Sequence, residues 1–131
     1  MVKMMKAQIE DAPILLQIQK EAFIKYAKKY GDFESNPYHM DLHRMEFNIK
    51  YRYGQYYKIL DEKSLEMIGG IFCFELDEKP IMKIAQFYFK NGYQHLGYGT
   101  YVLNELFRLN ENVKTWYVDT IMPVSYTHLR A

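Results

Sequence analysis

The chain has 131 residues, a length typical of one domain, and 49% of them are hydrophobic, which is enough to build a packed core. The formal net charge is +1, so there is no basis for bulk electrostatic binding to nucleic acid or to an anionic membrane. We therefore expect no nucleic acid and no membrane among its partners.

Cysteine usage and the lack of long apolar segments predict a location. Cys73 is the single cysteine, so no intrachain disulfide can form, and a reducing compartment is the simplest reading. No apolar stretch approaches the ~20 residues that a membrane helix needs, and the first residues lack the apolar segment of a signal peptide. We expect a cytoplasmic protein. Because Cys73 lies in an apolar run, we expect a buried, unreactive thiol rather than a nucleophile.

The first predicted elements are a strand at Val2 to Gln8 and a helix that starts near Glu10. The sequence from Glu10 to Pro13 supplies an acidic cap and a proline in the first turn. Apolar residues then recur at helical spacing up to Gly31, which suits the position after a helix end.

A loop over Asp32 to Pro37 leads to a second predicted helix at about Tyr38 to Tyr53, ended by Gly54. His39 and His43 could share a face of this helix, but two histidines at this spacing are weak evidence for a metal, and we expect no metal site. Four apolar side chains would lie on one face of the helix: Leu42, Met45, Ile49 and Tyr53.

Strand patterns dominate the next part of the chain. Strands are predicted at Gln55 to Leu60, Met67 to Leu76 and Ile81 to Phe89. The pair Gly69-Gly70 predicts a bulge or a close approach of another backbone. The third strand is apolar at both odd and even positions, as in a central strand covered on both faces.

A helix at Thr100 to Leu109 and a last strand at Val113 to Ile121 complete the predicted elements. The order is β-α-α-β-β-β-α-β, so we expect an α/β or mixed α+β fold in layers. The final strand, helix and strand should form a right-handed parallel crossover.

The segment Pro123 to Ala131 has no apolar periodicity and no obvious place in this fold. It resembles one reading frame of the transposase adaptor used to prepare sequencing libraries, and a natural disordered tail is the alternative. We therefore expect residues 1–122 to be an incomplete domain and residues 123–131 to be a non-native tail.

A glycine-punctuated turn, Gln94 to Gly99, lies between the third predicted strand and the helix that follows. Glycines let backbone amides approach a phosphate closely, and a helix N-terminus adds partial positive charge. In this setting Q-x-x-G-x-G resembles the acyl-coenzyme A signature of the GNAT superfamily of N-acetyltransferases. The upstream element order is also similar, so the resemblance covers about residues 3 to 121.

The resemblance implies a GNAT-like three-layer fold that lacks its last helix and strands here. It implies transfer of an acetyl group from acetyl-CoA, as co-substrate, to an amine of a small molecule or a protein. The backbone of Phe87 and Phe89 would pair with the pantetheine arm, while their rings belong to the core. The coenzyme A pyrophosphate would bind the backbone amides of the turn: Gln94, His95, Leu96, Gly97, Tyr98, Gly99 and Thr100.

Catalytic residues are not predicted sharply. Lys83 stands where some family members have a glutamate base, and Gln86 is not a base. Glu75 and Asp119 are the nearest carboxylates on predicted strands, although a structural role is the favoured reading of each. The family's usual acid is a tyrosine on a later helix, and Tyr126 lies in the suspected adaptor. The alternatives to an enzyme are a non-catalytic module that binds acyl-CoA or another phosphate ligand, or an inactive fragment.

Overall fold

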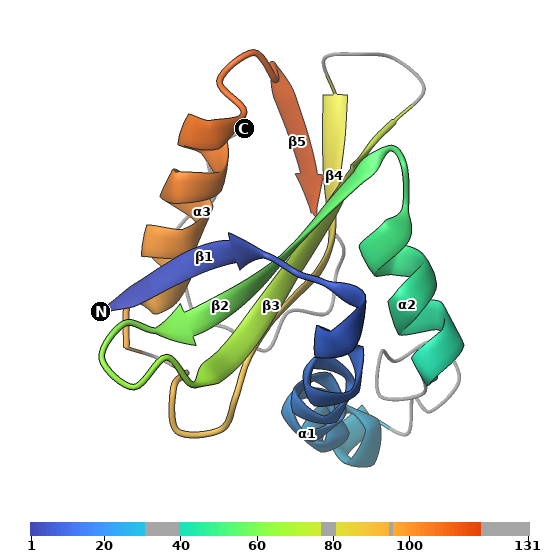
Figure 1. Ribbon diagram of the computed structural model, residues 1–131, viewed down its shortest axis with the longest axis vertical. Helices are drawn as coiled ribbons and strands as arrows, with labels where there is room; N and C mark the ends of the chain where they lie inside the picture. Colours follow the sequence, from blue (N-terminus) through green and yellow to red (C-terminus); the bar gives the residue numbers. More distant parts are fainter. Residues whose placement is uncertain (31–39, 77–80, 95, 119–131) are drawn as a thin grey trace.

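The computed structural model of the protein describes residues 1–30, 40–76, 81–94 and 96–118 (Figure 1). The elements follow the predicted order, with one added 3-10 turn before the first helix. Their bounds are β1 (Val2–Lys6), η1 (Ile9–Asp11), α1 (Ala12–Tyr30), α2 (Leu42–Lys50), β2 (Gly54–Asp61), β3 (Met67–Glu75), β4 (Ile81–Phe89), α3 (Tyr98–Leu109) and β5 (Thr115–Val118).

The five strands form a single sheet in the order β1-β2-β3-β4-β5. Neighbouring strands from β1 to β4 are antiparallel, and β5 is parallel to β4. β4 and β5 are connected through α3 and lie parallel, which confirms the predicted parallel arrangement of the last two strands. Figure 1 shows β5 beside the start of β4.

Helices cover both faces of the sheet, so the fold has three layers. On one face, α3 packs through Val102, Leu103 and Leu106 against strand residues such as Ile71 and Phe87. On the other face, α1 and α2 pack against a second set of strand residues, which includes Tyr56, Phe72 and Tyr88. We refer to these as the α3 face and the α1/α2 face. The mixed α+β prediction is confirmed.

The start of α1 is fixed by Asp11. Its carboxylate accepts a hydrogen bond of 2.7 Å from the Gln8 backbone amide, so it satisfies an N–H that precedes the helix. The same oxygen, Oδ2, lies 3.0 Å from Lys58 Nζ on β2. The two side chains are only 12% and 19% exposed, respectively. Asp11 therefore caps the helical segment and also ties it to the sheet, and β1 ends before Gln8, slightly earlier than predicted.

Replacing Asp11 with alanine is expected to lower the free energy of unfolding by about 2 kcal/mol, because it removes a cap and leaves a mostly buried ammonium unpaired. Urea unfolding followed by circular dichroism measures this loss. Glu10→Ala is the matched control, since Glu10 is exposed. Equal stability of the two variants would contradict the dual role of Asp11.

The second helix is shorter than predicted, and its buried face is different. Asp41 caps its start by accepting from the Arg44 amide at 2.8 Å. The helix stops at Lys50 because Tyr51 is extended, with ψ 123°. The buried residues are Met45 and Asn48, whereas Leu42 is 40% and Tyr53 49% exposed. The predicted stripe was therefore wrong at both ends, since Leu42 lies at the first turn and Tyr53 lies beyond the helix.

The two glycines of β3 allow close packing on opposite faces of the sheet. A Cβ on Gly69 would collide with the backbone carbonyl oxygen of Tyr88, and a Cβ on Gly70 would lie 2.5 Å from the Tyr88 hydroxyl. That hydroxyl lies 2.5 Å from the Tyr56 hydroxyl in the core of the α1/α2 face. Burial raises the pKa of both tyrosines, so both stay neutral. The predicted close approach is confirmed.

Candidate functional site

A tight turn follows β4, at the end of the sheet where the glycine-rich segment begins. The Tyr93 amide donates to the Lys90 carbonyl at 3.0 Å, and Gly92, between them, has φ +94°. Positive φ at the third position is what a type II turn requires, and glycine supplies it at little steric cost. The Lys90 amide donates to the Ile68 carbonyl at 2.7 Å, which anchors the turn to β3.

Gln94 holds the next part of the segment against the strand. Its side-chain Nε2 donates to the backbone carbonyl of Phe89, the last residue of β4, at 3.0 Å. The sequence predicted a role for the Gln94 backbone amide only, and this side-chain bond was missed. His95 lies outside the described residues.

The segment then enters α3 through Gly97, which is the N-cap residue with φ +82°. The Tyr101 amide makes a bond of 3.4 Å to the Gly97 carbonyl. The earlier amides, those of Tyr98, Gly99 and Thr100, therefore have no acceptor within the helix. Gly97 has no side chain that could cap them, and a Cβ built on it would meet nothing within 4 Å. Amides without an acceptor in the helix, the helix dipole and the lack of a side chain at Gly97 together suit an anionic ligand.

The aromatic residues before the turn are part of the core. Phe87 and Phe89 are 0% and 1% exposed on the α3 face, and their ring centroids lie 5.7 Å apart. The ring of Tyr98, in the first turn of α3, lies 6.3 Å from that of Phe89. The core prediction for these rings is confirmed. The predicted pairing of their backbone with a pantetheine arm stays a prediction.

A β-bulge interrupts β4 before this aromatic pair. On β3, Phe72 pairs with Gln86, but the next residue, Cys73, pairs with Ile84, so Ala85 is an extra residue. The alternation of side chains changes there. Residues of the α3 face are Met82 and Ile84 before the bulge, and Phe87 and Phe89 after it. The switch in the parity of large apolar residues along β4 was the sequence signal that could have revealed this bulge.

The bulge lies where β4 and β5 stop pairing in the described part of the chain. β5 pairs with β4 only from Ile81 to Ile84, the last pair being Ile84 with Val118. From Ala85 to Phe89, no described strand lies along that edge of β4. An unpaired strand edge offers amides and carbonyls to an extended ligand with peptide-like groups.

Of the two predicted catalytic carboxylates, Glu75 is among the described residues, and it does not lie along this edge of β4. Glu75 pairs with Met82 near the start of β4, and the register places it on the α3 face. Asp119 lies outside the described residues. Lys83 pairs with Phe74, so it lies on the α1/α2 face. A catalytic role for Glu75 or Asp119 stays a prediction.

Cys73 is buried on the α3 face, as the sequence predicted. Burial raises the pKa of its thiol to about 12. At pH 8 only about one molecule in 10⁴ would then carry the nucleophilic thiolate. The thiol is placed for packing.

Ellman's reagent at pH 8 should therefore leave Cys73 of the native protein unmodified on a timescale of minutes. In guanidinium chloride, the same reagent should titrate one thiol per chain, because the only cysteine is then exposed. Absorbance of the released thionitrobenzoate measures both states. Fast modification of folded protein would contradict the buried placement.

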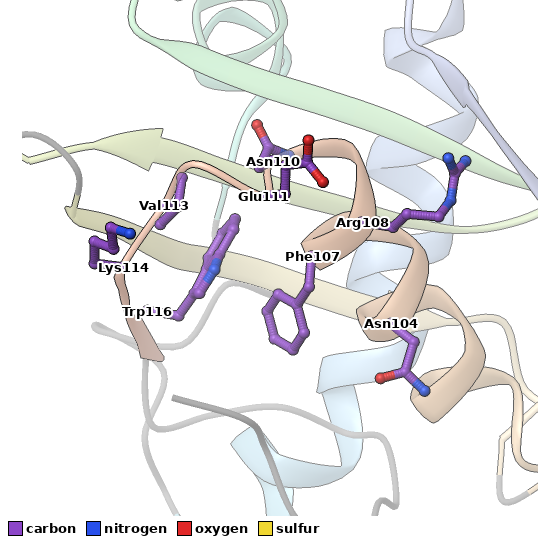
Figure 2. A pocket seen from close by; sticks show the side chains of 8 residues that line it. All are labelled: Asn104, Phe107, Arg108, Asn110, Glu111, Val113, Lys114 and Trp116. Atoms are coloured by element: carbon purple, nitrogen blue, oxygen red, sulfur yellow. The ribbon is translucent and has the colours of Figure 1, made fainter.

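Among the pockets of the described structure, one lies at the C-terminal end of α3 and another lies beside the turn that follows β4. A pocket of about 390 Å³ lies at the C-terminal end of α3 and the start of β5 (Figure 2). Its rings, Phe107 and Trp116, have centroids 5.1 Å apart. This end is roughly 18 Å from Gly97, at 1.5 Å per helical residue. The second pocket, about 440 Å³, lies beside the glycine turn and is lined by Asn91 and by α1 residues Pro13, Leu16, Gln17, Lys20, Glu21 and Ile24.

The described ranges also bear on a metal centre and on a membrane helix. No three His, Cys, Asp or Glu side chains there lie close enough together to hold a metal ion. His43 is exposed on α2, and His39 lies outside the described residues. In that same part of the chain, no helix is long and apolar enough to cross a membrane.

No protein-family model and no curated protein sequence matches the chain, but solved structures do. A tetramutant of the BH1408 protein from Bacillus halodurans matches with a TM-score of 0.76, at 13% identity over 91% of this chain and 83% of that chain. The PaiA N-acetyltransferase from Thermoplasma acidophilum, in complex with coenzyme A, matches with a TM-score of 0.66, at 16% identity over 85% and 72%. An aminoglycoside acetyltransferase from an uncultured soil metagenomic sample, in complex with sisomicin, matches with a TM-score of 0.64, at 13% identity over 92% and 78%.

The chain has the GNAT acetyltransferase fold. In this GNAT fold, the described residues supply one end of the sheet with three features together. These are the glycine turn with its open α3 N-terminus, the unpaired edge of β4, and the bulge at Ala85 and Gln86.

Proposed function

We propose that this protein is an N-acetyltransferase that transfers the acetyl group of acetyl-CoA to an amine. The observation that carries the proposal is the end of β4, where a closed turn leads to the N-terminus of α3, whose N-cap residue, Gly97, has no side chain to bond the helix amides. A structure with this fold holds coenzyme A, which supports an acyl-CoA ligand here.

Different backbone groups of the chain would bind different parts of acetyl-CoA. The amides from Gln94 to Thr100 would hold the pyrophosphate, because they point partial positive charge at it. The open edge of β4 after Ile84 would pair with the amides of the pantetheine arm. A β4 amide beside the thioester carbonyl would stabilise negative charge as it develops on the oxygen.

The acceptor must be a neutral amine in order to attack the thioester. A small-molecule amine is supported by the aminoglycoside acetyltransferase with the same fold, and a protein amine stays open. The base is unassigned, with Glu75 and Asp119 as candidates. A cytoplasmic location, suggested by the single cysteine, is part of this proposal.

A second candidate function is binding of acyl-CoA without turnover. The specific observation in its favour is that β4 carries Lys83 and Gln86, neither of which is a general base at neutral pH. The two candidates differ in one measurable property, the release of coenzyme A in the presence of an amine.

The first experiment is a calorimetric titration of the folded protein with acetyl-CoA, with circular dichroism on the same sample. We expect saturable binding. Coenzyme A release is then followed with Ellman's reagent, using sisomicin and a peptide with a free N-terminus as acceptors. Buried Cys73 should not contribute to the signal. Binding with amine-dependent release supports the enzyme, binding without release supports the module, and no binding by folded protein contradicts both.

A further inference from the structure

Gln86 has a buried polar atom that has no hydrogen-bond partner among the described residues. Its side-chain oxygen, Oε1, is buried and accepts no hydrogen bond within the described structure. A buried carbonyl-type oxygen without a donor costs folding free energy, because it has lost its water and gained nothing. Such atoms are rare in native proteins, and each one calls for a ligand, a water or a functional reason.

The bulge is what puts this oxygen in place. Gln86 pairs with Phe72, which packs on the α1/α2 face, so the Gln86 side chain lies on that face. Ala85, one residue earlier, packs on the same face. Two consecutive side chains on one face are a consequence of the bulge. Without the extra residue, position 86 would have faced α3.

Gln86 also lies just beyond the described pairing of β4 with β5. The last described pair between β4 and β5 is Ile84 with Val118, immediately before the bulge. Gln86 therefore lies near the start of the β4 edge along which no described strand runs, about 10 Å along the strand from Phe89, after which the glycine turn begins. On the same face, Tyr117 of β5, which pairs with Lys83, is 54% exposed, so the helices do not cover the Tyr117 side chain.

We propose that Gln86 is an acceptor-binding residue, whose Oε1 accepts a hydrogen bond from the N–H of the amine that receives the acyl group. Gln86 has this role only if the chain is a transferase, so it rests on the proposed function. The residue as a whole is partly exposed, and the terminal torsion of a glutamine is soft, so the oxygen can turn toward an incoming amine.

A carboxamide suits this task better than a carboxylate does. A negative charge beside the amine would favour the ammonium form, which has no lone pair for attack. A neutral oxygen holds one N–H and leaves the lone pair free. The nitrogen then bonds to the acetyl carbon, the carbon–sulfur bond breaks with its electrons on sulfur, and the amine loses one proton to solvent. Gln86 neither gives nor takes a proton.

Gln86→Met tests the idea, because methionine has a similar shape and removes the unpaired oxygen. We expect its Tm to rise by roughly 3 °C, since a costly buried polar atom is lost. Gln55→Met is the matched control, because Gln55 donates to Asn110 and accepts from Tyr57. Its Tm should fall. A lower Tm for Gln86→Met would show that the oxygen has a structural role and would overturn the assignment.

The kinetic arm uses acetyl-CoA with sisomicin and with a peptide that has a free N-terminus. For the amine that wild type acetylates, Gln86→Met should raise KM at least tenfold and leave KM for acetyl-CoA unchanged. Gln86→Glu should move the rise of kcat/KM to higher pH, because its charge holds the ammonium form. An unchanged amine KM in Gln86→Met, with active wild type, overturns the role of Gln86 alone. Inactive wild type that binds acetyl-CoA overturns the transferase function, and this role with it.

Discussion

Replacing Gly97 with valine is expected to weaken acetyl-CoA binding at least tenfold while the protein still folds. Gly97 has φ +82°, which a β-branched residue adopts only at a cost of about 2 kcal/mol. Apart from its chain neighbours, no described atom lies within 4 Å of a Cβ at this position, so the new side chain would project beside the first amides of α3. It would therefore exclude a phosphate rather than disturb the core. Isothermal titration calorimetry with acetyl-CoA measures the affinity.

Gly92→Val is the control that separates the effect of backbone strain from the loss of phosphate binding at the α3 N-terminus. Gly92 has φ +94° and also meets nothing within 4 Å, so the strain should be similar. It lies in the turn after β4 and not at the helix end. We expect both variants to lose similar stability in urea unfolding, with a large affinity loss only for Gly97→Val. Equal affinity losses would indicate a general effect of strain, and wild-type affinity of Gly97→Val would exclude α3 amides as the phosphate site.

The order of the elements could be predicted because each one carries a strong local signal. The acidic cap near Asp11 and the apolar runs of β2, β3 and β4 are properties of short segments. The glycine turn is likewise local, since Gly92 and Gly97 are needed for positive φ. These features do not depend on which distant residues they meet.

The face of α2 could not be predicted in the same way. Its register is set by the Asp41 cap and by packing on α1, and this arrangement buries the polar Asn48 together with Met45. A prediction based on the spacing of apolar residues does not place an asparagine on the buried face. The Asn48 amide and the Gln19 amide approach the sulfur of Met40 at 3.9 and 3.5 Å, and the contact of Gln19 joins segments 21 residues apart in sequence.

The candidate site shows the same division between local and non-local information. The turn and the α3 N-terminus follow from the sequence Gln94 to Thr100, whereas the bulge depends on how β4 aligns with β3. A strand that is apolar at both odd and even positions hides such a shift, because its neighbours on both faces accept apolar residues. Gln86 was therefore dismissed as a non-base, and its orientation became visible only in the folded sheet.

Replacing Gly69 with alanine is expected to cause the largest loss of stability, about 3 kcal/mol, measured by urea unfolding. The added Cβ would lie well under 3.0 Å from the Tyr88 carbonyl oxygen and 3.3 Å from the Phe89 Cα. Both are backbone atoms of β4, so the collision can be avoided only if β3 and β4 move apart. This part of the two strands lies next to the glycine turn. Gly92→Ala is the control, because it adds a Cβ in open space and costs only the strain of positive φ, about 1 kcal/mol. If Gly69→Ala were as stable as wild type, β3 and β4 could not approach this closely, and the geometry of the whole turn would be in question.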